Sequence, residues 1–378
     1  MSTAAESREV VASEALLTRV IAIDDTMTEA YSARANVRAR LGKFDDAIAD
    51  YQRAIELEPT EKGYYLNLGS VYAQKEDLEM AVEALSASFE VYLRAAQATE
   101  EGEGDEETEP QEPEPVFVAP LLNRARFLIE IGKQSTDEGT RAEAYGRAVA
   151  DCDQSIEMLQ DAPRQFGDLA FAHYQRGIVY EEMEDYEESV RSFTDALQIS
   201  TGLAGAYSRR GIVWFKLGDD ELALIDLNEA VQLNPTDMNA HLYRGFTLVR
   251  QEKYREAIAA YTKALERNDQ FVPALNNRGL AYFKDGQYAK AIEDFNEMLL
   301  INPKDATAYF KRGVTYMVME DYDRAITALS GATRVDPNYA IAHERLGDTY
   351  DSLGQVADAR QHHAEAARLR ADQGATTP

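Results

Sequence analysis

Apolar residues in this chain recur every three or four positions in short segments, the spacing expected of amphipathic helices. The segments follow one another with a period of 34 residues, which is marked by six glycines: Gly177, Gly211, Gly245, Gly279, Gly313 and Gly347. Each period predicts two helices, the first ending near a glycine such as Gly218, Gly286 or Gly354. The second, for example Ala289–Ile301, stops before a proline. One period over so many copies indicates a stack of similar units that bury their apolar faces against one another.

Small and large residues also keep fixed places within the period when the recurrent glycine is numbered position 8. Positions 20 and 27 are mostly small, positions 11 and 24 are mostly large, and proline often stands at position 32. Small residues let two helices approach closely, and large ones fill the space between helix pairs. Met298, a larger residue at position 27, predicts slightly wider packing in its copy. Position 20 illustrates the small-residue rule: Ser189, Ala223, Ala257, Ala291, Ala325 and Ala359.

This pattern resembles the tetratricopeptide repeat, a 34-residue helix–turn–helix unit with small residues at positions 8, 20 and 27 and proline at position 32. The resemblance implies an all-α fold, a right-handed α-solenoid or superhelix of about nine repeats. Residues 6–23 predict a helix that caps the first repeat, because a terminal repeat needs cover for its apolar face. The expected organisation is a capping helix in 1–27, repeats one and two in 28–95, an acidic disordered loop in 96–117, an irregular third repeat in 118–169, repeats four to nine in 170–373, and a flexible tail in 374–378.

Two stretches of extra residues interrupt the period before Gly177. The first contains residues 100–115, EEGEGDEETEPQEPEP, with nine acidic residues and no basic one. Its prolines, glycines and self-repulsion favour a disordered loop. Such a loop is either a solvated spacer or a segment that attracts a basic partner. Delivery of a metal ion or small molecule through this loop is a further alternative. The second stretch predicts a loop around 133–143 and a short one around 163–169.

The net charge of −28 narrows the classes of partner. Nucleic acid and anionic membrane surfaces are not expected as main partners, because phosphate binding needs clustered lysine and arginine. The chain shows neither an apolar run that would span a membrane nor a secretory signal at its start, so we expect a cytoplasmic location. Its single cysteine, Cys152, stands at a packing position and predicts a buried structural thiol. The polar last helix, Val356–Gln373, suits a cap and favours a monomer over end-to-end self-assembly.

The resemblance implies that the first helices line a concave groove, into which positions 2, 5, 9, 12 and 13 usually point. Position 9 is apolar in five consecutive copies, position 12 is apolar in four of them, and position 13 adds basic residues. This apolar ladder with a basic edge predicts a groove for a partner protein or peptide with apolar anchors and acidic flanks. Packing within a curved array is the alternative explanation. The predicted groove residues are Ile178, Ile212, Phe215, Lys216, Phe246, Val249, Arg250, Leu280, Phe283, Lys284, Val314 and Met317.

A column of arginines occupies position 7, beside the packing glycine. In three copies an aspartate follows sixteen residues later. We expect these arginines to make structural ion pairs between helices, with their stems packed as apolar cover. The three pairs are Arg34 with Asp50, Arg210 with Asp226, and Arg278 with Asp294.

No motif for catalysis, phosphate binding or metal binding appears, so we expect no enzyme activity, no cofactor and no metal site. The adjacent His362 and His363 point about 100° apart on a helix and cannot share a metal. Some family members clamp the C-terminal carboxylate of chaperone tails, but Ser32, Ala119 and Asn123 stand here where that clamp needs cations. The leading hypothesis is a non-catalytic scaffold or adaptor in complex assembly or chaperoning. A self-assembling structural protein is the alternative.

Overall fold

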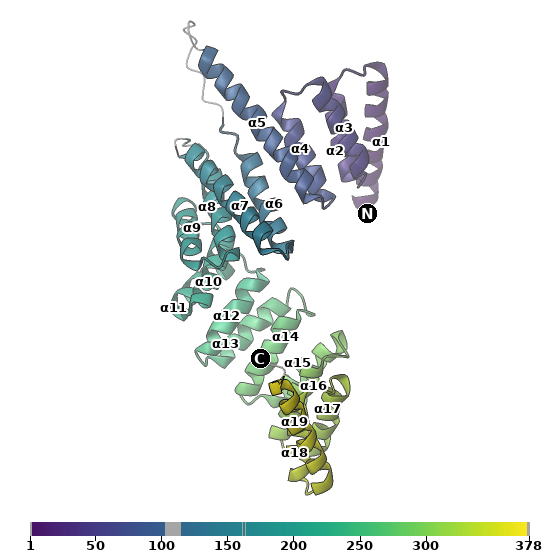
Figure 1. Cartoon of the computed structure of the whole chain (residues 1–378), viewed down its shortest axis with the longest axis vertical. Helices are drawn as coiled ribbons and strands as arrows, with labels where there is room; N and C mark the ends of the chain where they lie inside the picture. Colours follow the sequence, from purple (N-terminus) through teal and green to yellow (C-terminus); the bar gives the residue numbers. More distant parts are fainter. Residues whose placement is uncertain (1, 103–114, 161, 163, 376–378) are drawn as a thin grey trace. The chain divides into compact units, whose positions relative to one another are not determined.

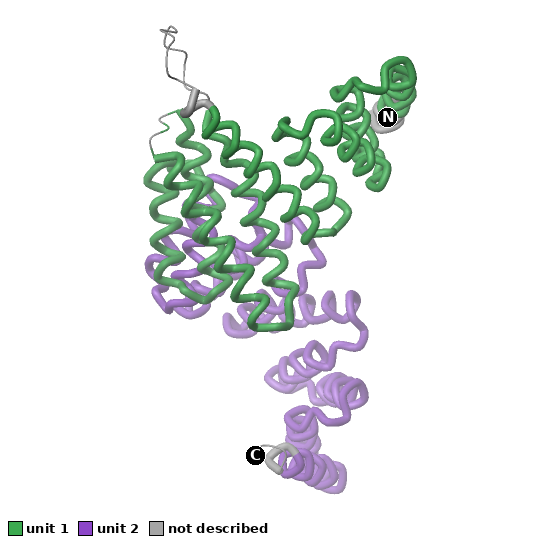
Figure 2. The backbone as a smooth tube through the Cα atoms, turned by 45° about the horizontal axis from the view of Figure 1, so that its top comes forward, with its two compact units in different colours: residues 1–206 green, residues 207–378 purple. Residues whose placement is uncertain are grey.

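The chain folds into an array of helix pairs. A computed structural model describes residues 2–102, 115–160, 162 and 164–375, and in these ranges all regular secondary structure is helical (Figure 1). The array divides into two compact units, residues 1–206 and 207–378 (Figure 2). This architecture confirms the predicted all-α fold. None of the described helices is long and apolar enough to cross a membrane.

Most helices have 12 to 17 residues, and four are longer, with 20 to 25: the capping helix, the helix before the acidic stretch, the second helix of the third repeat and the last helix. Unit 1 contains α1 (Ser2–Ile23), α2 (Thr28–Arg40), α3 (Phe44–Leu57), α4 (Lys62–Gln74), α5 (Leu78–Gly102), α6 (Ala119–Gln134), α7 (Glu138–Leu159), α8 (Phe166–Glu182) and α9 (Tyr186–Ile199). The unit boundary falls within α10 (Ala204–Leu217). Unit 2 continues with α11 (Asp220–Leu233), α12 (Met238–Arg250), α13 (Tyr254–Leu265), α14 (Val272–Lys284), α15 (Tyr288–Ile301), α16 (Ala306–Val318), α17 (Tyr322–Val335), α18 (Ala340–Ser352) and α19 (Val356–Ala375).

Even-numbered helices are the first helices of the repeats, and odd-numbered helices from α3 onward are the second. Within each unit, first helices pack on their own second helices, as α12 does on α13, and second helices pack on the next first helices, as α13 does on α14. First helices of neighbouring repeats also approach one another, as α12 does with α14 and α16 with α18. The first helices of unit 2 therefore share one side of that unit, which we call its inner face.

The small residue at position 8 is required by the large residue at position 24. A Cβ atom on Gly245 would lie 2.3 Å from the Tyr261 ring, and one on Gly177 would lie 2.7 Å from the Phe193 ring. Both aromatic side chains are fully buried. The 34-residue glycine period thus marks the points where the two helices of each repeat cross most closely.

In eight of the nine repeats the residue at position 15, just after the first helix, adopts a left-handed backbone conformation. The predicted helix-ending glycines take it, for example Gly286 with φ of 77°. Four other repeats place a glutamate there, which is unusual because the side chain strains this conformation. These glutamates, with φ between 58° and 67°, are Glu76, Glu184, Glu252 and Glu320.

The predicted acidic loop is shorter than expected at its start. Residues 96–102 continue helix α5, so the predicted loop boundary at residue 96 is wrong. Alanine and glutamate favour the helix until the first glycine, Gly102. The remaining acidic residues, 103–114, lie outside the described residues. At the far end, the backbone of Val116 is held by the Gln165 amide, which accepts from the Val116 N–H at 2.7 Å and donates to its carbonyl at 3.0 Å.

The third repeat is irregular in a different way from the prediction. Only residues 135–137 separate α6 from α7, so the expected loop around 133–143 is mostly helical. Asp137 caps α7 by accepting from the Thr140 backbone N–H. The extra residues lengthen both helices of this hairpin. Likewise α8 begins at Phe166, inside the second predicted loop, and α19 runs to Ala375, into the predicted tail.

Candidate functional site

The predicted groove residues differ in how much surface they offer. Ile178 and Ile212, at position 9 of their repeats, are only 9% and 8% exposed. They pack within their units and present little to a partner, because neighbouring helices cover this position in those repeats. Leu280, at the same position of α14, is 37% exposed. The other apolar members, Phe215, Phe246, Val249, Phe283, Val314 and Met317, are partly exposed.

Aromatic side chains gather at the start of the inner face of unit 2. The ring centroids of Phe215 and Phe246 are 6.0 Å apart, and Tyr243 lies edge-on to both, at 5.5 Å and 5.3 Å. All three rings pack on buried core residues while keeping part of their surface exposed. We call Phe215, Tyr243 and Phe246 the aromatic cluster. Sequence reasoning missed Tyr243, because it stands at position 6, outside the columns assigned to the groove.

Arg250 covers one side of the aromatic cluster. Its guanidinium lies 4.4 Å from the Phe215 ring centroid and donates to the Phe215 carbonyl at 3.0 Å. It also donates to Asp220 at 3.0 Å. The other two predicted cations, Lys216 and Lys284, are exposed. Arg250 is therefore held by its own unit, although it is exposed as the two lysines are.

A second polar feature of the inner face joins α14 and α16. The Lys311 ammonium donates to the side-chain oxygen of Asn276. Burial lowers the pKa of Lys311, although Asp305 acts in the opposite direction. Neither residue was predicted, since positions 5 and 6 showed no common residue type along the chain. The hydrogen bond joins two neighbouring first helices of the inner face.

The position-7 arginines are structural, as predicted. Arg34, Arg210 and Arg278 each donate twice to the aspartate sixteen residues later, with distances between 2.7 and 3.0 Å. In the long hairpin of the third repeat, Arg124 makes the same pair with Asp151, 27 residues away. Burial raises the pKa of Asp151, and Arg124 acts in the opposite direction, so the ion pair offsets part of the cost of burying this carboxylate.

Histidines pack within the repeats. His241 is buried, and this burial lowers its pKa, while its ring lies 3.1 Å from the Pro235 carbonyl. His343 and His362 stack on each other between α18 and α19, with their Nδ1 atoms 3.1 Å apart. Across the described ranges, no group of three or more histidine, cysteine or acidic side chains is arranged to hold a metal ion. Cys152 is buried, and burial raises the pKa of its thiol, which keeps it unreactive.

Comparison with known families and structures agrees with the repeat pattern. Family models described as tetratricopeptide or TPR repeats match residues 35–76, 63–93, 172–201, 244–309 and 310–375. A 74-residue stretch is 34% identical to the Protein SGT1 homolog of Oryza sativa subsp. japonica. That match spans 20% of this chain and only 20% of the relative.

Similar solved structures share less of the sequence. MamA from Desulfovibrio magneticus RS-1 is 24% identical, with a TM-score of 0.43, over 45% of this chain and 96% of its own. YrrB, described as a TPR protein with an unusual peptide-binding site, is 21% identical, with a TM-score of 0.45, over 50% of this chain and 96% of its own. The helix pairs, the recurrent close crossing and matches to repeat models over more than half of its residues together show that this chain belongs to the tetratricopeptide repeat family.

Proposed function

We propose that unit 2 is a scaffold that holds a segment of a partner protein along its inner face. Tetratricopeptide repeat arrays are scaffolds for protein–protein interaction and are generally non-catalytic. The observation that carries the proposal is the aromatic cluster, whose three rings keep exposed surface on the side shared by the first helices. Aromatic side chains in such positions anchor many protein interfaces.

The apolar residues beyond the cluster continue the binding surface along α14 and α16. Leu280 is exposed, and Phe283, Val314 and Met317 are partly exposed. A partner side chain that covers such a surface gains about 25 cal/mol for each Å² of apolar area removed from water. Two or three anchors spaced along an extended or helical segment are enough for specific binding.

The flanks of the partner segment are expected to be acidic. Lys284 is exposed and makes no ion pair within the described ranges. Arg250 is bound to Asp220, and both side chains keep partial exposure, so an acidic partner residue can compete for this guanidinium. Charge complementarity of this kind mainly sets partner choice and the rate of association.

The proposal is tested by changing exposed residues of the inner face. Ile212 is unsuitable, because a charge at this buried position would unfold the repeat. The double variant Leu280→Glu/Lys284→Glu removes an anchor and reverses a cation on α14, where both side chains are exposed. We expect partner proteins captured by the wild-type chain to be lost at least about tenfold from this variant, measured by quantitative mass spectrometry.

The matched control is Ile225→Glu/Lys304→Glu, which makes the same chemical changes at exposed sites on α11 and in the α15–α16 turn. Circular dichroism establishes that both variants keep their helical content. Equal capture by the two double variants would contradict the inner-face site.

A further inference from the structure

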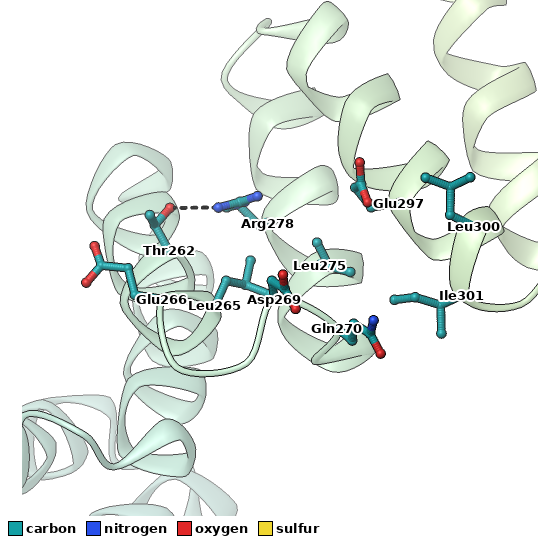
Figure 3. Close-up of a pocket in the computed structure, with 10 residues that line it drawn as sticks. All are labelled: Thr262, Leu265, Glu266, Asp269, Gln270, Leu275, Arg278, Glu297, Leu300 and Ile301. Carbon is teal, nitrogen blue, oxygen red and sulfur yellow. Dashed lines mark hydrogen bonds between the residues drawn. The ribbon is translucent and has the colours of Figure 1, made fainter. Parts of the chain in front are cut away.

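A groove opens in unit 2 between two second helices, on different elements from the aromatic cluster, which lies on α10 and α12. It has a volume of about 840 Å³ and lies between α13 and α15, with α14 as its floor (Figure 3). In the close-up, Leu275 lies between the residues of the two walls, and Arg278 is bonded to Thr262 across one side. We call this the α13–α15 groove.

The centre of the groove is apolar, and two of its residues are unusually exposed to solvent. Leu265 and Leu275 are buried beneath it, whereas Leu300 is 74% exposed and Ile301 is 38% exposed. A single exposed leucine is ordinary on a protein surface. Two adjacent exposed aliphatic residues at the wall of a groove form a continuous apolar surface that a partner can cover.

The rim of the groove is acidic. Glu266, Asp269 and Glu297 are exposed around the apolar centre. Glu266 is paired with Lys263 at 3.0 Å, an exposed pair that is readily displaced. Within the described residues, Asp269 and Glu297 make no ion pair. The one cation that lines the groove, Arg278, is already neutralised by Asp294 at 2.7 Å. The groove therefore presents net negative charge to an incoming ligand.

The equivalent groove at the end of unit 2 has a different lining, so the apolar centre and acidic rim are specific to the α13–α15 groove. It lies between α17 and α19 and has a volume of about 610 Å³. At the place of Leu300 it has Arg368, and at the place of the apolar floor residue Leu275 it has His343. The same backbone arrangement thus carries a polar, partly basic lining in one groove and an apolar, acid-rimmed lining in the other.

We infer that the α13–α15 groove is a second docking site, which accepts a protein segment with one or two apolar side chains flanked by lysine or arginine. The apolar residues cover Leu300 and Ile301, and the flanking cations pair with Glu297 and Asp269. This inference goes beyond the proposed function, because it uses the second helices and requires flanks of the opposite charge. The same molecule then holds an acid-flanked segment on one face and a base-flanked segment on another.

The test measures binding of three fluorescent peptides by polarisation: Lys-Lys-Leu-Leu-Lys-Lys, its Ser-Ser counterpart, and its Glu-flanked counterpart. We expect the first peptide to bind at least about tenfold more tightly than either of the others, since only this peptide has both the apolar side chains and the basic flanks that the groove fits. The variant Leu300→Arg is expected to lower affinity for the first peptide about tenfold. Arginine is tolerated by the fold at this place, because Arg368 occupies it in the last repeat.

The control variant Ile225→Arg removes another exposed aliphatic residue from a second helix and makes the same charge change. It is expected to bind the first peptide almost as the wild type does. Equal losses in Leu300→Arg and Ile225→Arg, or equal binding of the leucine and serine peptides, would show general attraction to an acidic chain and overturn the inference. The inner-face variant Leu280→Glu/Lys284→Glu is expected to bind the first peptide no more weakly than its own control, so the two sites are tested separately.

Discussion

Single polar atoms in the core show how the repeats differ at the residue scale. Tyr51 and Tyr261 occupy the same position, 24, and both are fully buried. The Tyr51 hydroxyl donates to the Asn36 side chain at 2.8 Å, and burial raises the pKa of Tyr51 to about 12. In the other repeat Phe246 replaces that asparagine, and the Tyr261 hydroxyl has no hydrogen-bond partner among the described residues. One phenol therefore stabilises its repeat, while the other carries an uncompensated cost of desolvation.

This difference predicts opposite effects of the same substitution. Tyr51→Phe is expected to lower the free energy of unfolding by about 1 kcal/mol, since it leaves Asn36 without its donor. Tyr261→Phe is expected to leave the free energy unchanged or to raise it by up to about 1 kcal/mol. Urea denaturation of both variants measures the two values. A loss in Tyr261→Phe as large as that in Tyr51→Phe would contradict the structural argument.

The arginine column shows a similar residue-level rule. Where position 23 holds aspartate, the guanidinium is fully engaged, as in Arg278. In two repeats alanine stands there, as Ala260 and Ala328, and the Nε atoms of Arg244 and Arg312 are buried without a hydrogen bond. The arginine stems still pack, so the column persists where the ion pair is absent.

At the scale of the helix, the turn after the first helix has one backbone conformation and two residue types in eight of the nine repeats. Glycine and glutamate both occupy the left-handed position 15, but only glycine does so without strain. Glu252→Gly is expected to raise the free energy of unfolding by about 0.5–1 kcal/mol, measured by chemical denaturation.

The control for this prediction is Glu293→Gly, an exposed change inside α15. It is expected to lower the free energy of unfolding by about 1 kcal/mol, because glycine weakens a helix interior. If Glu252→Gly destabilised the chain as much as the control does, the glutamate would have to make a contact that offsets its strain.

The elements were largely predictable because the repeat signal is periodic. The glycine period located the close helix crossings, and the spacing of sixteen residues identified the pair between Arg278 and Asp294. Composition gave a wrong prediction where one state was assigned to a whole stretch of residues. The acidic stretch predicted a loop from residue 96, although the helix continues as long as alanine and glutamate do. In the third repeat, extra residues lengthened two helices that an inserted loop was expected to separate.

The candidate site was less predictable than the fold. Position in the repeat placed Leu280 and Phe283 on the first helices correctly, but exposure depends on how neighbouring repeats pack. Ile212 is buried for that reason, although its residue type and position match Leu280. The α13–α15 groove gave no sequence signal, because its lining comes from three helices and a turn that no single column joins.

At the scale of the whole molecule, charge is the dominant property. The net charge is −28 and the isoelectric point is about 4.6. Self-repulsion of this size weakens the compact state at neutral pH and low ionic strength. We expect the melting temperature to rise by several degrees as sodium chloride is added, because screening weakens this repulsion. Individual exposed ion pairs contribute about 0–1 kcal/mol each and are not expected to reverse the trend.

Scanning calorimetry or thermal circular dichroism measures this effect, with sucrose as an uncharged additive for comparison. A melting temperature that falls with salt would mean that the ion pairs contribute more than the repulsion costs.

The arginine column also gives the array a direction. Arg278 bonds Asp294 within its own repeat and reaches back to Thr262 in the repeat before it. Other arginines reach back in the same way: Arg34 to Thr18, Arg124 to Ser86, and Arg312 to Asn296. Trimming repeats from the C-terminal side removes each donor together with its repeat and leaves a hydroxyl or amide that water can satisfy. Trimming from the N-terminal side strips acceptors from charged donors, which is costlier. We therefore expect removal of the last repeat to lower the free energy of unfolding less than removal of the first.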